Sequence, residues 1–128
     1  MSGKPILVLD FDGVLHSYAS GWQGADKVAD PPVPGAAHFI ARAQDHFVVA
    51  VHSSRSHQPG GIEAMQAWLR DVIREAGYVD EVFSGIQWPT ENPPAMLTID
   101  DRTITFEGWW PEIEDLRAFR PWNKKEQS

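Results

Sequence analysis

The segment ILVL at residues 6–9 constrains the fold most, because all four of its residues are aliphatic. A strand with one face in water alternates apolar and polar side chains, whereas a strand buried on both faces is apolar throughout. We therefore predict that this segment is a buried strand of a parallel sheet. Helices cover both faces of such a sheet, so the rest of the chain is expected to supply them.

The remaining segments alternate between patterns typical of helices and of strands. Apolar residues recur every three or four positions in 60–78, which predicts an amphipathic helix with Gly77 at its C-terminal cap. Residues 17–35 are rich in glycine and proline and are predicted to form a loop. Further helices are predicted at 35–46 and 111–119, and further strands at 47–54, 80–85, 95–100 and 103–106. The pattern predicts a three-layer α/β domain with a mostly parallel, five-stranded sheet.

The 128 residues are enough for one domain, which we assign to residues 1–122, and we expect the tail 123–128 to be disordered. The net charge of −7 gives no long-range attraction to nucleic acid or to an anionic membrane. The chain has no cysteine, which excludes disulfides and thiolate catalysis. Its apolar runs are too short to span a membrane, so a soluble, cytoplasmic protein is expected.

Acidic residues follow two of the predicted strands at their carboxyl ends, where open α/β sheets bind ligands. Asp10 and Asp12 follow the first strand, Asp100 ends the strand at 95–100, and Asp101 follows it. Four carboxylates in one cleft repel one another unless a cation lies among them, and Mg²⁺ binds carboxylates, water and phosphate oxygens. The spacing of these acidic residues does not match the calcium-binding loop of an EF-hand. The alternative to a metal site is structural: Asp12 and Gly13 would form a simple turn after the strand, and the segment DDR at 100–102 would form a surface ion pair.

Residues 10–15, DFDGVL, resemble the first motif of the haloacid dehalogenase (HAD) superfamily of aspartate-dependent phosphohydrolases. Ser53 matches the Ser/Thr of its second motif, and Asp100 with Asp101 match its acidic fourth motif. The resemblance covers nearly the whole chain in the correct order, and the closer pattern is similar to small HAD-like proteins of phages and bacteria. It implies a Rossmann-like domain and an Mg²⁺-dependent phosphatase. The short segments after the first two motifs imply the capless type, with no separate cap domain.

The resemblance also implies a role for each matched residue. Asp10 would attack phosphorus and form an aspartyl-phosphate. Asp12 would protonate the leaving oxygen and then activate water. Asp10, the backbone carbonyl of Asp12, Asp100 and, through water, Asp101 would hold Mg²⁺, and Ser53 would bind a phosphoryl oxygen.

The lysine of the family's third motif has no counterpart in this chain. Asn92 stands in its place and brings no positive charge to the phosphoryl group. Arg55, which follows the second motif, is our first candidate for a substitute cation, because a guanidinium binds phosphate through two N–H groups. A salt bridge to a surface carboxylate is an equal alternative for Arg55. Arg102 and Lys27 are the next candidates.

The expected substrate is a phosphorylated molecule. An open, capless site favours a macromolecular substrate or a partner subunit as a lid. Nucleotides and nucleic-acid ends are both candidate substrates, and a homo-oligomer is a candidate assembly. Trp22 and Trp88 lie on loops beside the predicted site, where bases could stack on them, although tryptophan more often packs. Substrate binding is assigned to Gly13, Ser54, Trp22 and Trp88, with a minor role open for His16 and His57. The alternative function is a catalytically degenerate HAD-like module that holds metal, phosphate or a protein partner.

Overall fold

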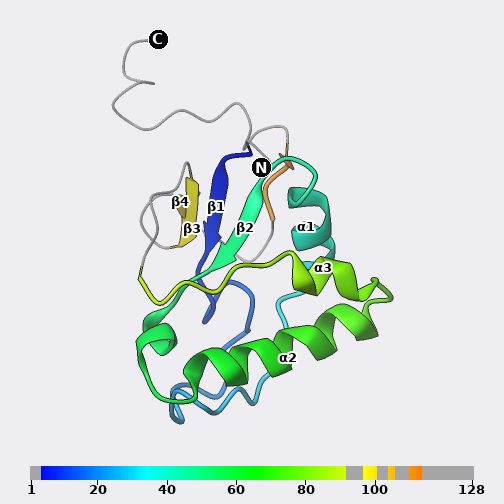
Figure 1. The fold of residues 1–128 in the computed structure, drawn as a ribbon. Helices are drawn as coiled ribbons and strands as arrows, with labels where there is room; N and C mark the ends of the chain where they lie inside the picture. Colours follow the sequence, from blue (N-terminus) through cyan, green and yellow to red (C-terminus); the bar gives the residue numbers. More distant parts are fainter. Residues whose placement is uncertain (1–3, 92–96, 101–103, 106–109, 114–128) are drawn as a thin grey trace.

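The structure, a computed structural model, describes residues 4–91, 97–100, 104–105 and 110–113, and for 97, 98, 100, 104 and 105 it describes the backbone alone. The described chain contains both strands and helices (Figure 1). The strands are β1 (Ile6–Leu9), β2 (Val48–Val51), β3 (Leu97–Asp100) and β4 (Ile104–Thr105). The α-helices are α1 (Ala36–Ala43), α2 (Gly61–Glu75) and α3 (Asp80–Ser84), and Ser54–His57 form a short 3₁₀ helix, η1.

The four strands form one sheet in the order β2-β1-β3-β4, and every neighbouring pair is parallel. The aliphatic segment ILVL is β1 and lies between β2 and β3, which confirms the prediction of a buried strand in a parallel sheet. A single parallel bridge between Ala50 and Gln87 adds one position beyond β2. The strands β1 and β2 point toward the same end of the molecule (Figure 1), so the residues that follow them meet there.

The apolar core joins the sheet to two helices. Leu7 and Leu9 of β1 belong to one cluster of buried residues that also includes Val49, Val51, Phe39, Ile40, Met65, Leu69 and Ile73, from β2, α1 and α2. Val8 and Ala50 alternate with them along the strands, point to the opposite face and are also buried. Burial on both faces explains why β1 is apolar at every position.

The predicted helix at 60–78 is observed as α2, and its end has the predicted glycine. Gly77 has a φ of 90°, a conformation that favours glycine. The amide of Gly77 donates to the carbonyl of Arg74, and the amide of Tyr78 donates to the carbonyl of Ile73, which is the Schellman pattern. The predicted loop 17–35 and the helix after it are also observed. Within the described chain no helix has the length and apolar character needed to cross a membrane.

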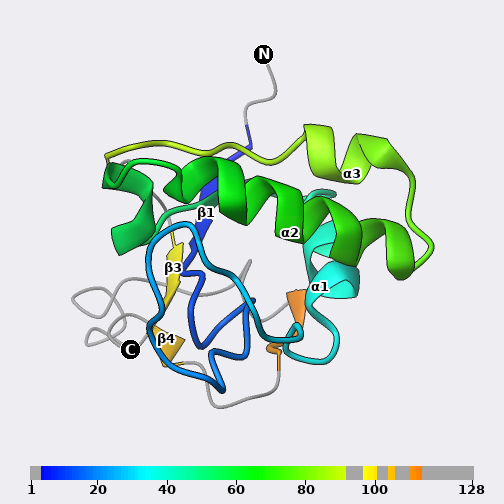
Figure 2. The same cartoon turned by 90° about the horizontal axis from the view of Figure 1, so that it is seen from below.

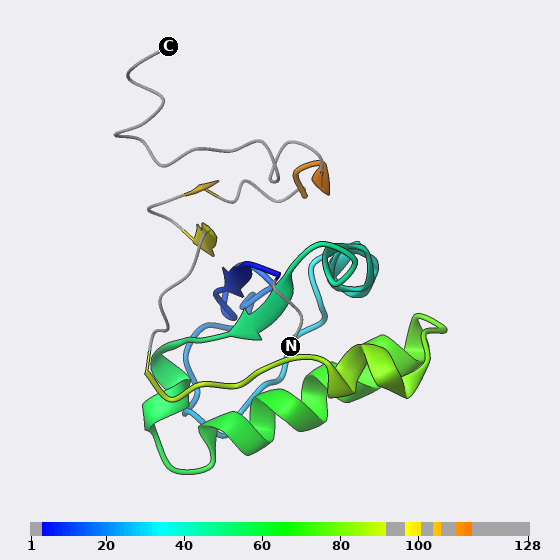
Figure 3. The same cartoon turned by 45° about the horizontal axis from the view of Figure 1, so that its top comes forward.

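The prediction of a strand at 80–85 is wrong, because Asp80–Ser84 form the helix α3. Asp80 and Glu81 lie in its first turn, where the helix dipole favours acidic residues. Arg74, in the last turn of α2, pairs with Asp80 at 2.9 Å, so α3 lies against the end of α2 (Figure 3). A short apolar run cannot by itself distinguish a helix from a strand. The chain reaches the edge of the sheet after α3, where Gln87 forms a bridge with Ala50 of β2.

Two other predicted boundaries differ from the structure or lie outside it. The strand predicted at 47–54 ends at Val51, because Ser53 caps η1. Of the predicted closing helix at 111–119 the structure describes residues 111–113, and the tail 123–128 lies outside the described residues. The structure therefore establishes a mixed α/β fold with a parallel sheet of four strands in its described part.

Gly61, the first residue of α2, lies against the backbone of η1. A Cβ at this position would be 1.9 Å from the carbonyl oxygen of Arg55 and 2.8 Å from its carbonyl carbon. We expect Gly61→Ala to lower the free energy of unfolding by about 1–3 kcal/mol, because backbone atoms would have to move. Helix propensity alone predicts that alanine would raise the free energy of unfolding, by about 1 kcal/mol. Urea denaturation measures the change, and a more stable variant would contradict this expectation.

Candidate active site

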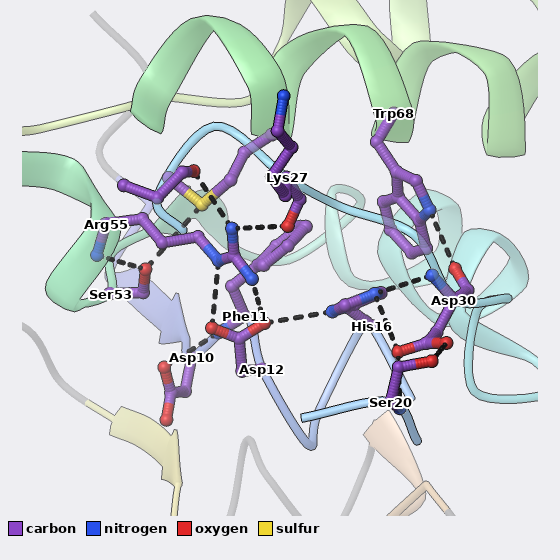
Figure 4. A network of polar contacts seen from close by, with 12 residues as sticks. Asp10, Phe11, Asp12, His16, Ser20, Lys27, Asp30, Ser53, Arg55 and Trp68 are labelled. Atoms are coloured by element: carbon purple, nitrogen blue, oxygen red, sulfur yellow. Dashed lines mark hydrogen bonds and ion pairs between the residues drawn. The ribbon is translucent and has the colours of Figure 1, made fainter. Parts of the chain in front are cut away.

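The structure brings Asp10, Asp12, Ser53 and Arg55 together at the carboxyl end of β1 (Figure 4). The amide of Asp10 donates to the carbonyl of Ile99, at 3.2 Å, so Asp10 lies beside the end of β3. Leu9 pairs with Ile99, which places Asp10 and Asp100 at neighbouring positions of two adjacent parallel strands. The side chain of Asp100 and the residues Asn92, Asp101 and Arg102 lie outside what the structure describes.

A tight turn after β1 explains the glycine of the first motif. The Oδ1 atom of Asp10 accepts a hydrogen bond from the amide of Phe11, at 2.7 Å. The carbonyl of Phe11 accepts from the amides of Leu15 and His16, both at 2.9 Å. Gly13 is exposed and has a φ of 82°, which a residue with a side chain rarely adopts. The turn returns the chain so that His16 lies beside Asp12; substrate binding by Gly13 stays a prediction.

Asp12 accepts hydrogen bonds from two buried side chains. Arg55 donates from Nε to Oδ2, at 2.9 Å, and from Nη2 to Oδ1, at 3.1 Å. His16 Nδ1 lies 2.9 Å from Oδ1 of Asp12, and its Nε2 accepts from the amide of Asp30, at 3.0 Å. Because Nε2 accepts, this network assigns the ring proton of neutral His16 to Nδ1. The side chain of Asp12, itself 18% exposed, is therefore fixed in one orientation.

Arg55 is fully buried, and its guanidinium also ties down the loop that follows the first motif. Nη1 donates to the carbonyl oxygens of Gly24, Ala25 and Lys27, at 2.9–3.0 Å. Each edge of the guanidinium thus has an N–H group already in use. The interpretation of Arg55 as a free cation that binds phosphate is corrected accordingly, since a two-point contact with phosphate would need these same groups. The alternative of an ion pair is observed, but it is buried and formed with Asp12.

Ser53 is also engaged inside the protein. It caps η1, and its Oγ accepts from the amide of Arg55, at 2.9 Å, while the Oγ of Ser56 accepts from the amide of Ser53. The Oγ of Ser53 lies 3.6 Å from the sulfur of Met65. The side chain is buried, so its contact with a phosphoryl oxygen stays a prediction. Ser54, the first residue of η1, is exposed beside it.

Three residues that the sequence reasoning missed anchor the loop 17–35, which crosses the end of the sheet in Figure 2. The carboxylate of Asp30 accepts from the Oγ and the amide of Ser20, at 2.6 and 2.8 Å, and these bonds hold the pKa of Asp30 below its ordinary value. Trp68 donates from Nε1 to the carbonyl of Asp30, at 3.0 Å. A loop aspartate and serine carry no sequence pattern that would have identified them.

The remaining predicted residues differ in their surroundings. Trp22 is 48% exposed, with the Cζ of Arg55 4.9 Å from the centre of its ring. Trp88 is partly buried and packs against the core, its ring centre 6.2 Å from that of Phe83, which agrees with the packing alternative. Lys27 contributes a carbonyl to Arg55, and in Figure 4 its side chain points away from Asp10 and Asp12.

The end of β1 and β3 carries residues of the type that binds Mg²⁺, because carboxylate oxygens are donors that Mg²⁺ prefers. The register places the backbones of Asp10 and Asp100 beside each other at this end of the sheet. The described side chains, which do not include Asp100 or Asp101, contain no group of three or more acidic or histidine residues that could hold a metal. Comparisons of the chain with protein-family models, curated proteins and solved structures found no match.

Proposed function

We propose that this protein is an Mg²⁺-dependent phosphatase that hydrolyses phosphomonoesters through an aspartyl-phosphate. The observation that carries the proposal is the arrangement at the end of β1, where Asp10 lies next to β3 and Asp12 is fixed by buried Arg55 and His16. Two carboxylates one residue apart, with different partners, suit two different chemical tasks.

The sheet order supports a Rossmann-like, HAD-like domain. The four described strands lie in the order β2, β1, β3 and β4, and an isolated parallel bridge joins Gln87 to Ala50 of β2. The chain order reverses at β1, and ligands of open α/β sheets bind at such a point, beyond the carboxyl ends of the strands. Asp10 and Asp12 lie at this point. The proposed fold and the proposed site therefore support each other.

In the first step an oxygen of the Asp10 carboxylate attacks phosphorus, and the bond from phosphorus to the leaving oxygen breaks. Asp12 gives its proton to that oxygen. In the second step Asp12 takes a proton from water as the water oxygen attacks phosphorus. The bond from phosphorus to Asp10 breaks, which releases inorganic phosphate and restores both side chains.

Arg55 and His16 act on Asp12 in both steps. When Asp12 has lost its proton, the guanidinium offsets its negative charge, and the three hydrogen bonds keep the carboxylate in place. Mg²⁺, when bound, supplies positive charge toward the carboxylates and the phosphoryl oxygens. Asp10, the backbone carbonyl of Asp12, Asp100 and Asp101 would hold the ion.

One observation favours the second candidate, a degenerate HAD-like module that binds metal or phosphate without turnover. The hydroxyl of Ser53 and the N–H groups of Arg55 are used within the protein. Neither group therefore faces a phosphoryl oxygen in this conformation. The two candidates differ in whether phosphate is released.

A phosphatase assay with p-nitrophenyl phosphate separates the two candidates. We expect the purified protein to release p-nitrophenol with Mg²⁺, to lose this activity in excess EDTA and to regain it when Mg²⁺ is restored. A protein that binds Mg²⁺ by calorimetry but shows no turnover would support the binding module instead. Activity that is unaffected by EDTA would contradict the dependence on Mg²⁺.

A further inference from the structure

The buried ring of His16 is held by aromatic and by polar neighbours (Figure 4). It stacks on Phe11, with ring centres 5.5 Å apart, and meets Trp68 edge to face, at 5.3 Å. Its Nδ1 atom faces the carboxylate of Asp12, and its Nε2 atom faces the amide of Asp30. Because aromatic rings hold its plane and each nitrogen has a polar partner, the imidazole has one orientation.

Both polar partners of the His16 ring select the same tautomer. The ionised carboxylate of Asp12 accepts hydrogen bonds and favours a proton on Nδ1, whereas the amide of Asp30 donates and favours an Nε2 without a proton. In the other tautomer, two acceptors would face each other at Nδ1 and two donors at Nε2. The amide of Asp30 is thus the contact that opposes a proton on Nε2.

This tautomer determines which oxygen of Asp12 is left to carry a proton. Each carboxylate oxygen has two acceptor sites. Among the described residues, Oδ1 accepts from Nδ1 of His16, at 2.9 Å, and from Nη2 of Arg55, at 3.1 Å, whereas Oδ2 accepts from Nε of Arg55 alone, at 2.9 Å. The remaining site is on Oδ2. If Nδ1 lacked its proton, it would itself accept the proton of Asp12, which would then point toward the buried ring and not toward a leaving oxygen.

The side chain of Asp30 keeps its own amide in place at the ring. Its carboxylate accepts from the hydroxyl and the amide of Ser20, at 2.6 and 2.8 Å, and both bonds depend on that carboxylate. Without them the loop around residue 30 is no longer tied to Ser20, and water can replace the amide at Nε2. Water both donates and accepts, so either tautomer of His16 is then permitted.

We infer that Asp30 is a positioning residue which, through His16, keeps the transferred proton of Asp12 on Oδ2, an inference that rests on the proposed function. In the first step the bond from Asp10 to phosphorus forms, the bond from phosphorus to the leaving oxygen breaks, and this proton passes from Oδ2 to that oxygen. The His16 ring keeps its own proton on Nδ1 throughout.

The experiment compares two substrates whose leaving oxygens differ in their need for a proton. p-Nitrophenol is a far stronger acid than phenol, so its anion leaves readily without a proton, whereas the leaving oxygen of phenyl phosphate depends on the acid. We expect Asp30→Ala to lower kcat/KM for phenyl phosphate about tenfold more than for p-nitrophenyl phosphate, because kcat/KM includes the step in which the leaving oxygen departs. Asp30→Asn, which can still bond to Ser20, is expected to retain most of the wild-type ratio. Asp45→Ala, the same change at an exposed aspartate, is the matched control and is expected to leave the ratio unchanged.

His16→Asn tests whether Asp30 acts through the ring. The side-chain nitrogen of asparagine is as many bonds from the backbone as Nδ1 of histidine, and it donates to Asp12 without any choice of tautomer. In this background, Asp30→Ala is expected to leave the ratio of the two substrates unchanged. A change of the ratio there would overturn the inference. Equal losses for both substrates in Asp30→Ala alone would also overturn it, because the role of Asp30 would then be structural only.

NMR spectroscopy tests the inference without turnover, and also where His16→Asn does not fold. In proton–nitrogen correlation spectra of the histidine rings, wild-type His16 is expected to carry its proton on Nδ1, and Asp30→Ala is expected to populate both tautomers. If the wild type hydrolyses neither substrate, this result supports the role of Asp30 at the ring while the phosphatase proposal fails. A proton on Nε2 in the wild type, or on Nδ1 alone in Asp30→Ala, would overturn the inference whatever the activity.

Discussion

Asp10→Asn is expected to lower kcat for p-nitrophenyl phosphate by at least about 10³-fold, because the amide cannot act as the nucleophile. The substitution preserves the shape of the side chain. The remaining amide oxygen can still accept the hydrogen bond from the amide of Phe11. The loss should therefore come from chemistry rather than from misfolding.

The control is Asp71→Asn, which makes the same change at an exposed position of α2. Thermal denaturation of both variants should give melting temperatures close to that of the wild type, and Asp71→Asn should keep its activity. An Asp10→Asn enzyme with wild-type kcat would show that Asp10 is not the nucleophile. A large drop in its melting temperature would instead assign Asp10 a structural role.

The fold was predictable where the signal is local. The strand β1 is apolar at every position because both faces are buried, and α2 has helical spacing with a glycine at its cap. The prediction of a strand in place of α3 was wrong because the local signal there is weak. Its five residues are too few to show a period, and the contact of Asp80 with Arg74 depends on the preceding helix.

The candidate site was predictable only in part, because its two halves are far apart in the sequence. The position of Asp10 and Asp12 follows from the strand before them. Arg55 lies 43 residues from Asp12, and no spacing rule connects the two. The sequence reasoning considered an ion pair for Arg55 at the surface; the buried pair depends on how the loop 17–35 folds over it. Tertiary contacts of this kind have no local pattern.

The described part of the chain contains two arginine–aspartate pairs with nearly the same geometry in different surroundings. Arg55 binds Asp12 through Nε and Nη2, at 2.9 and 3.1 Å, and Arg74 binds Asp80 through the same atoms, also at 2.9 and 3.1 Å. Arg55 is 0% exposed and Arg74 is 53% exposed. The two pairs therefore contrast a buried arginine, which also bonds three loop carbonyls, with an exposed arginine of the same pairing geometry.

Arg55→Met is expected to lower the free energy of unfolding by about 3–5 kcal/mol, because it leaves the carboxylate of Asp12 and three loop carbonyls without their buried donor. Arg74→Met is expected to cost at most about 1 kcal/mol, since water replaces the exposed partner. Urea denaturation at neutral pH measures both losses.

Arg55→Lys keeps the charge at this position but removes the planar donor group. An ammonium cannot reproduce the two-point contact with Asp12 and at the same time bond the loop carbonyls, so a lysine should restore only part of the stability lost in Arg55→Met. Because the same bonds orient Asp12, kcat for p-nitrophenyl phosphate should fall in the lysine variant even where it is fully folded. Equal losses of stability for Arg55→Met and Arg74→Met would contradict the buried network, and a folded lysine variant with normal kcat would show that this network does not position Asp12 for catalysis.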